Sequence, residues 1–174
     1  GRPTKEVDYL MNLLIEMVYK EIPDLMEKNV KLVVIGNMDR LPEKPRENLQ
    51  MAIDKTANNT GMQLNLAITY GGRQEIVEAT RALAAQVAAG TLKVEEIDEN
   101  LFAQNLYLKG APDPDLVIRT GGEFRLSNYL LWQAAYSEFY VTDTLWPDFT
   151  KEEFMKAVEF YKTRERRFGK VLHE

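Results

Sequence analysis

The sequence contains no cysteine, which excludes disulfides and thiol catalysis for this chain. Its only histidine is His173, the last residue but one, so a Cys/His zinc site is excluded as well. No apolar run reaches the roughly 20 residues of a membrane span. The net charge of -5 argues against a nucleic-acid partner held by a global positive field. A local anion site stays possible, because the arginines are unevenly distributed along the chain.

What is present is ordinary for a globular protein. Hydrophobic residues make up 45% of the chain and charged residues 28%, so neither disorder nor low complexity is indicated. A length of 174 residues predicts a single domain, residues 1–174, with a real core. The chain starts at Gly1-Arg2-Pro3 without an initiator Met or a signal-peptide pattern. We expect either that the polypeptide was cut here or that upstream residues are missing.

Short apolar runs alternate with segments of helical periodicity. Residues 4–22 predict an amphipathic helix capped by Thr4, which Pro23 bends or restarts. The remaining pattern predicts strands at 30–35, 64–70, 116–118 and 138–141, and helices at 43–58, 73–89, 95–106 and 150–167, the last capped by Thr150. Strands that alternate with helices predict an α/β fold with a mostly parallel central sheet flanked by helices.

Loops at the carboxyl ends of such strands are the usual ligand sites. Here they are Gly36-Asn37, Gly71-Gly72-Arg73 and 119–122. Two of the three combine glycine with arginine, the combination that a pyrophosphate site needs. The third loop leads into the richest segment of the chain, which contains Arg119, Arg125 and Ser127.

Each residue type in that segment suits an anion. Glycines allow an anion nest of backbone N–H groups, arginines bind phosphate oxygens in pairs, and a serine hydroxyl adds a neutral donor. Arg125 and Ser127 are two residues apart and would share one side of an extended segment. The alternative is a surface turn with two solvated arginines, because the spacing is only a moderate signal.

Residues 115–128, Asp-Leu-Val-Ile-Arg-Thr-Gly-Gly-Glu-Phe-Arg-Leu-Ser-Asn, closely resemble the last signature of the cis-prenyltransferases. Further matches to this family lie at Arg2-Pro3 and at 65–76, 131–133, 135–140, 146–149 and 164–169. The resemblance covers essentially the whole chain and is closest to the undecaprenyl pyrophosphate synthase kind. The chain has no aspartate-rich DDxxD motif of the trans-acting synthases, which favours the cis class.

The resemblance implies a cytoplasmic, Mg²⁺-dependent enzyme that works as a homodimer. It would condense isopentenyl pyrophosphate onto an allylic, farnesyl-type pyrophosphate and form a cis double bond at each step. The expected product is a long-chain polyprenyl pyrophosphate that partitions to the membrane. Undecaprenyl pyrophosphate, the lipid carrier precursor for peptidoglycan, is the product we expect. Part of the apolar region 138–160 is the expected dimer interface.

Residue roles carry over from the same resemblance. Substrate pyrophosphate would be bound by Arg2, Arg119, Arg125, Leu126 and Ser127. Glu138 would be a magnesium ligand, although a solvated carboxylate at a strand edge is the alternative. Met62 would close the far end of the product tunnel and set chain length, or would simply fill the core. The broad apolar helix at 4–28 has the same two interpretations, tunnel wall or core.

One part of the family pattern has no counterpart here. The N-terminal strand and the glycine loop that carries the family's Mg²⁺-binding aspartate are absent, and so is the Asn-Trp that precedes Arg2. We therefore expect this polypeptide not to turn over by itself, whereas the native protein should. Two alternatives to the enzyme are a non-catalytic partner subunit and a pyrophosphate-binding module without chemistry. The complete set of Arg119, Arg125, Ser127 and Glu138 favours the enzyme.

Overall fold

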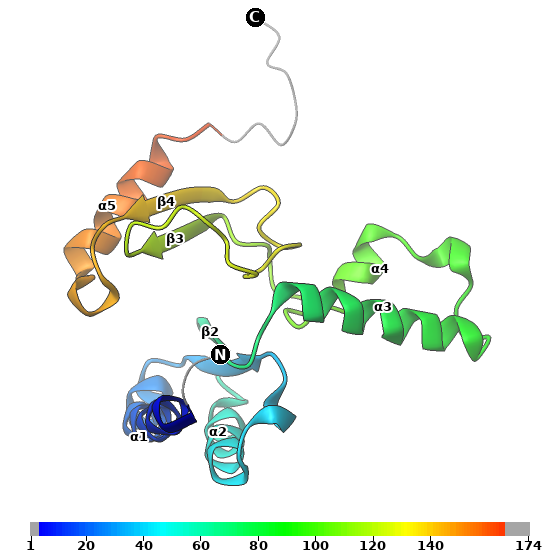
Figure 1. Cartoon of the computed structure of the whole chain (residues 1–174), viewed down its shortest axis with the longest axis horizontal. Coiled ribbons are helices and arrows are strands. Elements are labelled where there is room, and N and C mark those ends of the chain that lie inside the picture. Colours follow the sequence, from blue (N-terminus) through cyan, green and yellow to red (C-terminus); the bar gives the residue numbers. More distant parts are fainter. Residues whose placement is uncertain (1–3, 166–174) are drawn as a thin grey trace, which may run out of the picture. The chain divides into compact units, whose positions relative to one another are not determined.

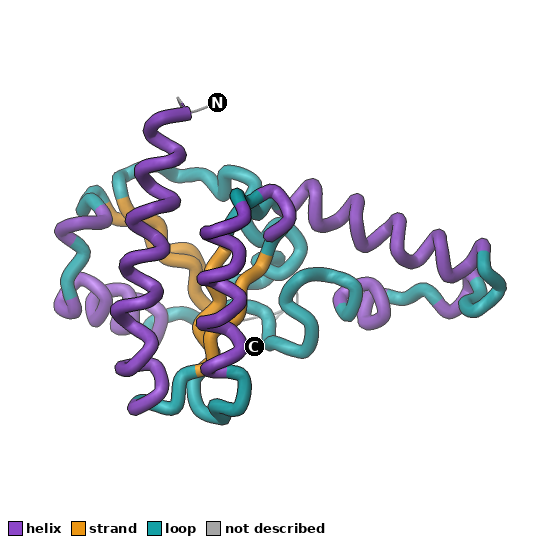
Figure 2. The backbone as a smooth tube through the Cα atoms, turned by 90° about the horizontal axis from the view of Figure 1, so that it is seen from below, coloured by secondary structure: helices purple, strands orange, loops and turns teal. Residues whose placement is uncertain are grey.

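The computed structural model describes residues 4–165, and these form an α/β fold. The chain divides into two compact units, Gly1–Tyr70 and Gly71–Glu174. Each unit contains one two-stranded parallel sheet with helices beside it (Figures 1 and 2). The predicted alternation of strands and helices and the parallel pairing are confirmed. Within the described residues the strands form two two-stranded sheets, one in each unit.

The first unit contains two helices and two strands. Its elements are α1 (Thr4–Glu27), β1 (Lys31–Ile35), a 3₁₀ turn (Met38–Arg40), α2 (Glu43–Thr56) and β2 (Gln63–Ala67). Strand β1 pairs in parallel with β2, so that Lys31 lies opposite Gln63. Helix α1 runs through Pro23. The expected restart there is absent because Ile22 and Leu25, on either side of the proline, both pack into the same core and hold the helix in place.

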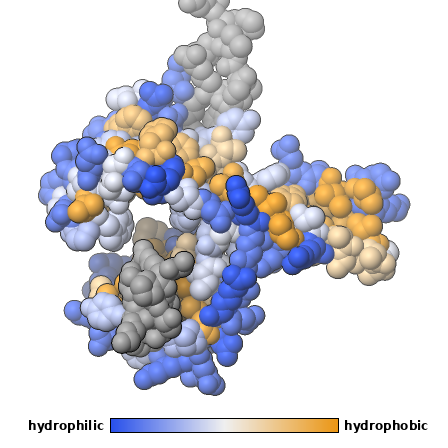
Figure 3. Space-filling view, in the orientation of Figure 1, coloured by the Kyte–Doolittle hydropathy of each residue, from blue (hydrophilic) through white to orange (hydrophobic). Residues whose placement is uncertain are grey.

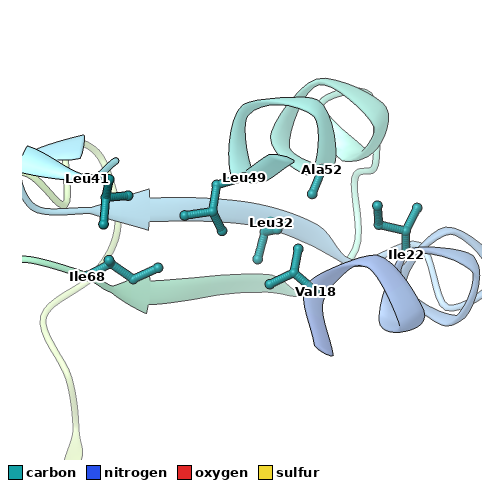
Figure 4. Packing of buried hydrophobic residues seen from close by; sticks show 7 residues of the cluster. All are labelled: Val18, Ile22, Leu32, Leu41, Leu49, Ala52 and Ile68. Carbon is teal, nitrogen blue, oxygen red and sulfur yellow. The ribbon is translucent and has the colours of Figure 1, made fainter. Parts of the chain in front are cut away.

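The core of this unit lies between the two helices and the sheet. Figure 4 shows Val18 and Ile22 from α1, Leu32 from β1, and Leu49 and Ala52 from α2, joined by Leu41 and Ile68. Thr56, fully buried at the end of α2, accepts a hydrogen bond from the Leu32 amide (3.0 Å) and donates one to the Ala52 carbonyl (2.9 Å). This hydroxyl ties the last turn of α2 to β1.

Strand β2 is less buried than predicted. Leu64 is 37% exposed and Ala67 is also exposed, because β2 is paired with β1 alone among the described strands. Met62 immediately precedes β2, and its carbonyl accepts a hydrogen bond from the Lys31 amide (2.9 Å). The backbone at Met62 is therefore fixed, while its side chain is 65% exposed.

The second unit contains the remaining elements. They are α3 (Gly72–Ala88), a 3₁₀ turn (Val94–Glu96), α4 (Glu99–Ala103), β3 (Leu116–Thr120), β4 (Glu138–Thr142), a 3₁₀ turn (Trp146–Asp148) and α5 (Lys151–Lys162). Strands β3 and β4 are parallel, with Leu116 opposite Glu138. Helix α5 packs on β4 through the rings of Tyr140 and Phe160, whose centroids are 5.4 Å apart.

Two helix predictions in this unit had different outcomes. Thr150 does cap α5, by accepting a hydrogen bond from the Glu153 amide. The predicted helix at 95–106 is shorter, because Asp98 accepts from the Leu101 amide and starts α4 only there. None of the helices within residues 4–165 is long and apolar enough to cross a membrane.

Candidate functional site

The loop that leaves β3 is held against the end of β4. Gly121 and Gly122 have φ angles of +83° and +72°, which glycine adopts without strain. Their amides donate to the carbonyls of Thr144 (3.0 Å) and Thr142 (2.9 Å). The anion nest predicted from these glycines is therefore wrong, because both N–H groups already have protein acceptors. The glycines shape the loop instead.

Arg119, the fourth residue of β3, is hydrogen-bonded to the same loop through its side chain. Its Nη1 donates to the Arg125 carbonyl (2.9 Å) and to the Ser127 hydroxyl (3.3 Å). Ser127 has a φ of +50°, so the segment is not extended and the predicted alternation of Arg125 and Ser127 along it does not apply. The structure nevertheless brings the Arg119 guanidinium and the Ser127 hydroxyl together, as an anion site requires.

Arg125 carries the second guanidinium of the site. Its Nη1 lies 2.6 Å from the Glu123 carboxylate, and both side chains are more than half exposed. An exposed ion pair of this kind contributes only about 0–1 kcal/mol. A multivalent anion can therefore replace Glu123 as the partner of Arg125 at small cost, with a bidentate geometry that arginine supports.

A cavity of about 560 Å³ lies beside this loop and one face of the β3–β4 sheet. Arg119, Thr120 and Arg125 make it polar, and the other lining residues are apolar or aromatic: Val117, Ile118, Phe124, Leu126, Tyr129, Phe139 and Val141. Leu126 thus lines the cavity, in keeping with its predicted place among the substrate-binding residues. Burial raises the pKa of the Tyr129 hydroxyl above its usual value. Cationic and apolar walls together suit a phosphate ester with a small apolar group.

The start of α3 contributes differently from what the sequence predicted. The amides of Gly72 and Arg73 donate to the backbone carbonyl and to the side-chain Oδ1 of Asn128, each at 2.8 Å. A Cβ on Gly71 would lie 2.8 Å from Asn128 Nδ2, and one on Gly72 would lie 2.8 Å from Leu131 Cγ. The two glycines therefore allow a distant segment to approach closely. The interpretation of 71–73 as a phosphate loop fails for these two amides.

Residues 119–127, with Arg119 at the end of β3 and Arg125 and Ser127 after it, are called the arginine loop below. Glu138 lies apart from the arginine loop along the strands. It is the first residue of β4, opposite Leu116, whereas Arg119 lies opposite Val141. Three residues of strand separate the two positions by about 10 Å. The Glu138 Oε2 accepts a hydrogen bond from Arg164 Nε (3.0 Å).

Glu138 could bind a metal ion only together with ligands from outside the described part of the protein. Within residues 4–165 no group of three or more His, Cys, Asp or Glu side chains could hold an ion by itself. One carboxylate with phosphate oxygens and water is, however, a donor set that Mg²⁺ accepts. Of the other predicted site residues, Arg2 lies outside the described residues and Met62 belongs to the first unit.

A second hollow of about 420 Å³ lies on α3 and the segment that follows it. Figure 3 shows hydrophobic residues gathered over this part of the chain. Its lining is almost wholly apolar and comprises Thr80, Leu83, Ala84, Val87, Ala88, Val94, Ile97 and Phe102. It contains no cationic side chain, so its lining does not suit an anion.

An α/β fold whose arginine loop follows a parallel strand contains a candidate phosphate-ester site. Comparisons with known proteins identify the family of the chain. Residues 1–169 match the undecaprenyl diphosphate synthase family. The isoprenyl transferases of Heliobacterium mobile and Bacillus subtilis are 50% and 48% identical over 170 residues, which is 98% of this chain. The chain belongs to the undecaprenyl diphosphate synthase family.

The chain spans 65% of the Heliobacterium relative and 69% of the Bacillus one. Among solved structures, lavandulyl diphosphate synthase from Lavandula x intermedia, in complex with dimethylallyl diphosphate, superposes with a TM-score of 0.95 at 39% identity; the match covers 98% of this chain and 74% of that one. A probable undecaprenyl diphosphate synthase from Campylobacter jejuni gives a TM-score of 0.84 at 37% identity over 97% and 77% of the two chains.

Proposed function

We propose that this chain carries the isopentenyl pyrophosphate site of a cis-prenyltransferase. The enzyme condenses isopentenyl pyrophosphate onto an allylic, farnesyl-type pyrophosphate and forms cis double bonds. Its product is a long-chain polyprenyl pyrophosphate, undecaprenyl pyrophosphate, that supplies cell-wall synthesis. The observation that supports this most directly is the 560 Å³ cavity, where the guanidinium groups of Arg119 and Arg125 adjoin an apolar wall.

The contacts of the loop support a separate role for each residue in this proposal. Arg125 exchanges Glu123 for the pyrophosphate of the isopentenyl substrate, and the Ser127 hydroxyl donates to the same group. Arg119 holds the loop and adds positive charge. Val117, Phe139 and Val141 receive the five-carbon isopentenyl group and exclude water from it. Orienting the two substrates accounts for much of the rate in such a reaction.

Magnesium fits this proposal through Glu138. The ion, when bound, neutralises charge on pyrophosphate oxygens, and Glu138 supplies its protein carboxylate. Glu138 must then exchange Arg164 for the metal, which is a small change because more than a fifth of the Glu138 side chain and half of the Arg164 side chain are exposed.

The ligand class of a relative supports the substrate class. The lavandulyl diphosphate synthase that superposes on this chain holds dimethylallyl diphosphate, a five-carbon diphosphate like isopentenyl pyrophosphate. For assembly we propose a homodimer. The 3₁₀ turn after β4 leaves large apolar side chains in solvent, with Leu145 61% and Trp146 74% exposed, and a second copy would cover them. A monomeric mass by light scattering at micromolar concentration would contradict the dimer.

The function is tested by turnover of the complete gene product with isopentenyl and farnesyl pyrophosphates and Mg²⁺. Arg125→Ala should raise the KM for isopentenyl pyrophosphate at least tenfold and also lower kcat, while changing the KM for farnesyl pyrophosphate less. Arg81→Ala, at an exposed position on α3 in the same unit, is the matched control and should change neither KM.

The same assay separates the alternatives. An unchanged KM for isopentenyl pyrophosphate in Arg125→Ala would exclude this loop as the site. A non-catalytic partner subunit would show no turnover alone and would regain it with a second protein. A pyrophosphate-binding module would bind inorganic pyrophosphate as tightly as isopentenyl pyrophosphate and form no longer chain.

A further inference from the structure

The first turn of α3 receives its cap from a residue far along the chain. Gly71, at the N-cap position, has no side chain to accept from the exposed amides that begin a helix. Asn128 supplies both acceptors, its carbonyl to Gly72 and its Oδ1 to Arg73. Asn128 has a φ of +65°, a left-handed conformation that asparagine tolerates better than most residues. Its side chain therefore caps α3 from a distant segment of the same chain.

Two further contacts join the same segment to the same turn. Leu131 packs so closely on Gly72 that a Cβ there would meet its Cγ at 2.8 Å. Gln133 Nε2 donates to the Glu75 carboxylate (3.1 Å), which is 99% buried and also accepts from the Tyr107 amide (2.7 Å). Residues 128–133 are thus attached to the rigid start of α3.

Ser127 is contacted by Arg119 and directly precedes Asn128, which is attached to α3. On one side, Arg119 contacts the Arg125 carbonyl and the Ser127 hydroxyl. On the other side, Asn128 fixes the next residue to α3. We propose that Asn128 is a positioning residue for the pyrophosphate site: by capping α3 it sets where the Ser127 hydroxyl and the Arg125 backbone stand relative to Arg119. This inference rests on the proposed function of the loop.

The chain contains a matched control for this role. Asn29, in the first unit, has a φ of +55°, and its carbonyl accepts from the Gly61 amide (3.0 Å). Its Oδ1 accepts from the preceding Thr60 amide (2.9 Å). Asn29 therefore makes the same pair of contacts, to two successive amides from a left-handed conformation, without adjoining the arginine loop in the chain.

The experiment compares Asn128→Gly with Asn29→Gly in the complete gene product. Glycine keeps the left-handed backbone and its carbonyl and removes the side-chain acceptor. At position 29 it also removes the Nδ2 donor to the Thr60 hydroxyl (3.2 Å), so the control loses at least as many contacts. Both variants should lose thermal stability to a similar extent. Only Asn128→Gly should weaken the binding of inorganic pyrophosphate, measured by calorimetry, by about tenfold, and raise the KM for isopentenyl pyrophosphate by a similar factor. Its kcat and its KM for farnesyl pyrophosphate should change by less than about threefold.

A second variant reaches the same segment from α3. Gly72→Ala places a Cβ against Leu131 and 3.3 Å from the Asn128 carbonyl, while alanine favours the helix itself. It should therefore shift residues 128–131 without melting α3, and it should weaken pyrophosphate binding as well. This variant supplies the answer if Asn128→Gly does not fold.

Each outcome has a defined meaning. If wild type binds pyrophosphate in an Arg125-dependent way but Asn128→Gly and Gly72→Ala bind it equally well, the positioning role is overturned and the proposed function stands. Equal effects of Asn29→Gly and Asn128→Gly on the KM for isopentenyl pyrophosphate also overturn it, because a general loss of stability would then explain both. A wild type with neither binding nor turnover overturns the proposed function, and this inference with it.

Discussion

Met62 offers the sharpest test of how product length is set. Of the two predicted roles, core filling is the weaker one, because the side chain is 65% exposed and lies outside the buried cluster of the first unit. Its carbonyl is held by the Lys31 amide, so Met62→Ala leaves the backbone in place. An exposed substitution of this kind changes the free energy of unfolding by less than about 0.5 kcal/mol.

The effect on product can be estimated from packing. If Met62 blocks the growing chain, each further addition meets an overpacking cost of about 1–3 kcal/mol. Removing that cost multiplies the ratio of further addition to termination by about 5 to 150, since each 1.36 kcal/mol is a factor of ten. Met62→Ala should therefore yield products longer than the wild-type end product.

The assay is chromatography of dephosphorylated products from the complete gene product, alongside a melting curve. Met155→Ala, at another exposed methionine on α5, is the matched control and should leave product length unchanged. Longer chains with an unchanged melting temperature support the plug. Wild-type products from Met62→Ala would refute the reasoning, and a large loss of stability would return Met62 to a structural role.

Three further predictions follow from other contacts. Glu138→Gln should raise the Mg²⁺ concentration needed for half-maximal activity at least tenfold, and an unchanged Mg²⁺ titration would remove Glu138 from the metal site. Thr56→Val should lower the free energy of unfolding by about 1–3 kcal/mol in denaturant titrations, because the buried Leu32 amide loses its acceptor, whereas Thr80→Val on the exposed face of α3 should have little effect. The pKa of Glu152 lies below its usual value, because its own backbone N–H and the Thr150 hydroxyl stabilise the carboxylate. That stability is present at neutral pH and disappears as the pH falls through the lowered pKa, so Glu152→Gln should show a smaller loss of α5 helicity in acid by circular dichroism.

Local signals in the sequence were sufficient for most of the elements. Apolar runs predicted β1, β3 and β4 to within two residues, and the hydroxyl of Thr150 predicted the start of α5. These features depend on neighbours in the chain, so a sequence pattern can record them. The sequence also pointed to the arginine loop as an anion site, with a solvated surface turn as the alternative, and that role stays a prediction.

Long-range contacts account for what the sequence did not predict. The glycines at 71 and 72 resemble a phosphate loop, yet they accommodate Asn128 and Leu131 from more than 50 residues away. The capping role of Asn128 was not predicted, because the residues next to it in the sequence do not indicate which helix it caps. Pro23 was expected to bend or restart α1. The helix is not interrupted there, because core packing on both sides of the proline outweighs one missing hydrogen bond.

The cap on α3 also bears on the order in which the chain folds. Helix α5 has its cap in Thr150, three residues before the amide it serves, so its first turn closes as soon as those residues exist. The first turn of α3 waits for a side chain 55 residues further on. The conformational entropy of closing a loop of that length must be lost before this contact can stabilise the helix. We therefore expect α3 to be synthesised with a frayed start, and its first turn to be capped only when the segment that carries Asn128 has folded back onto it.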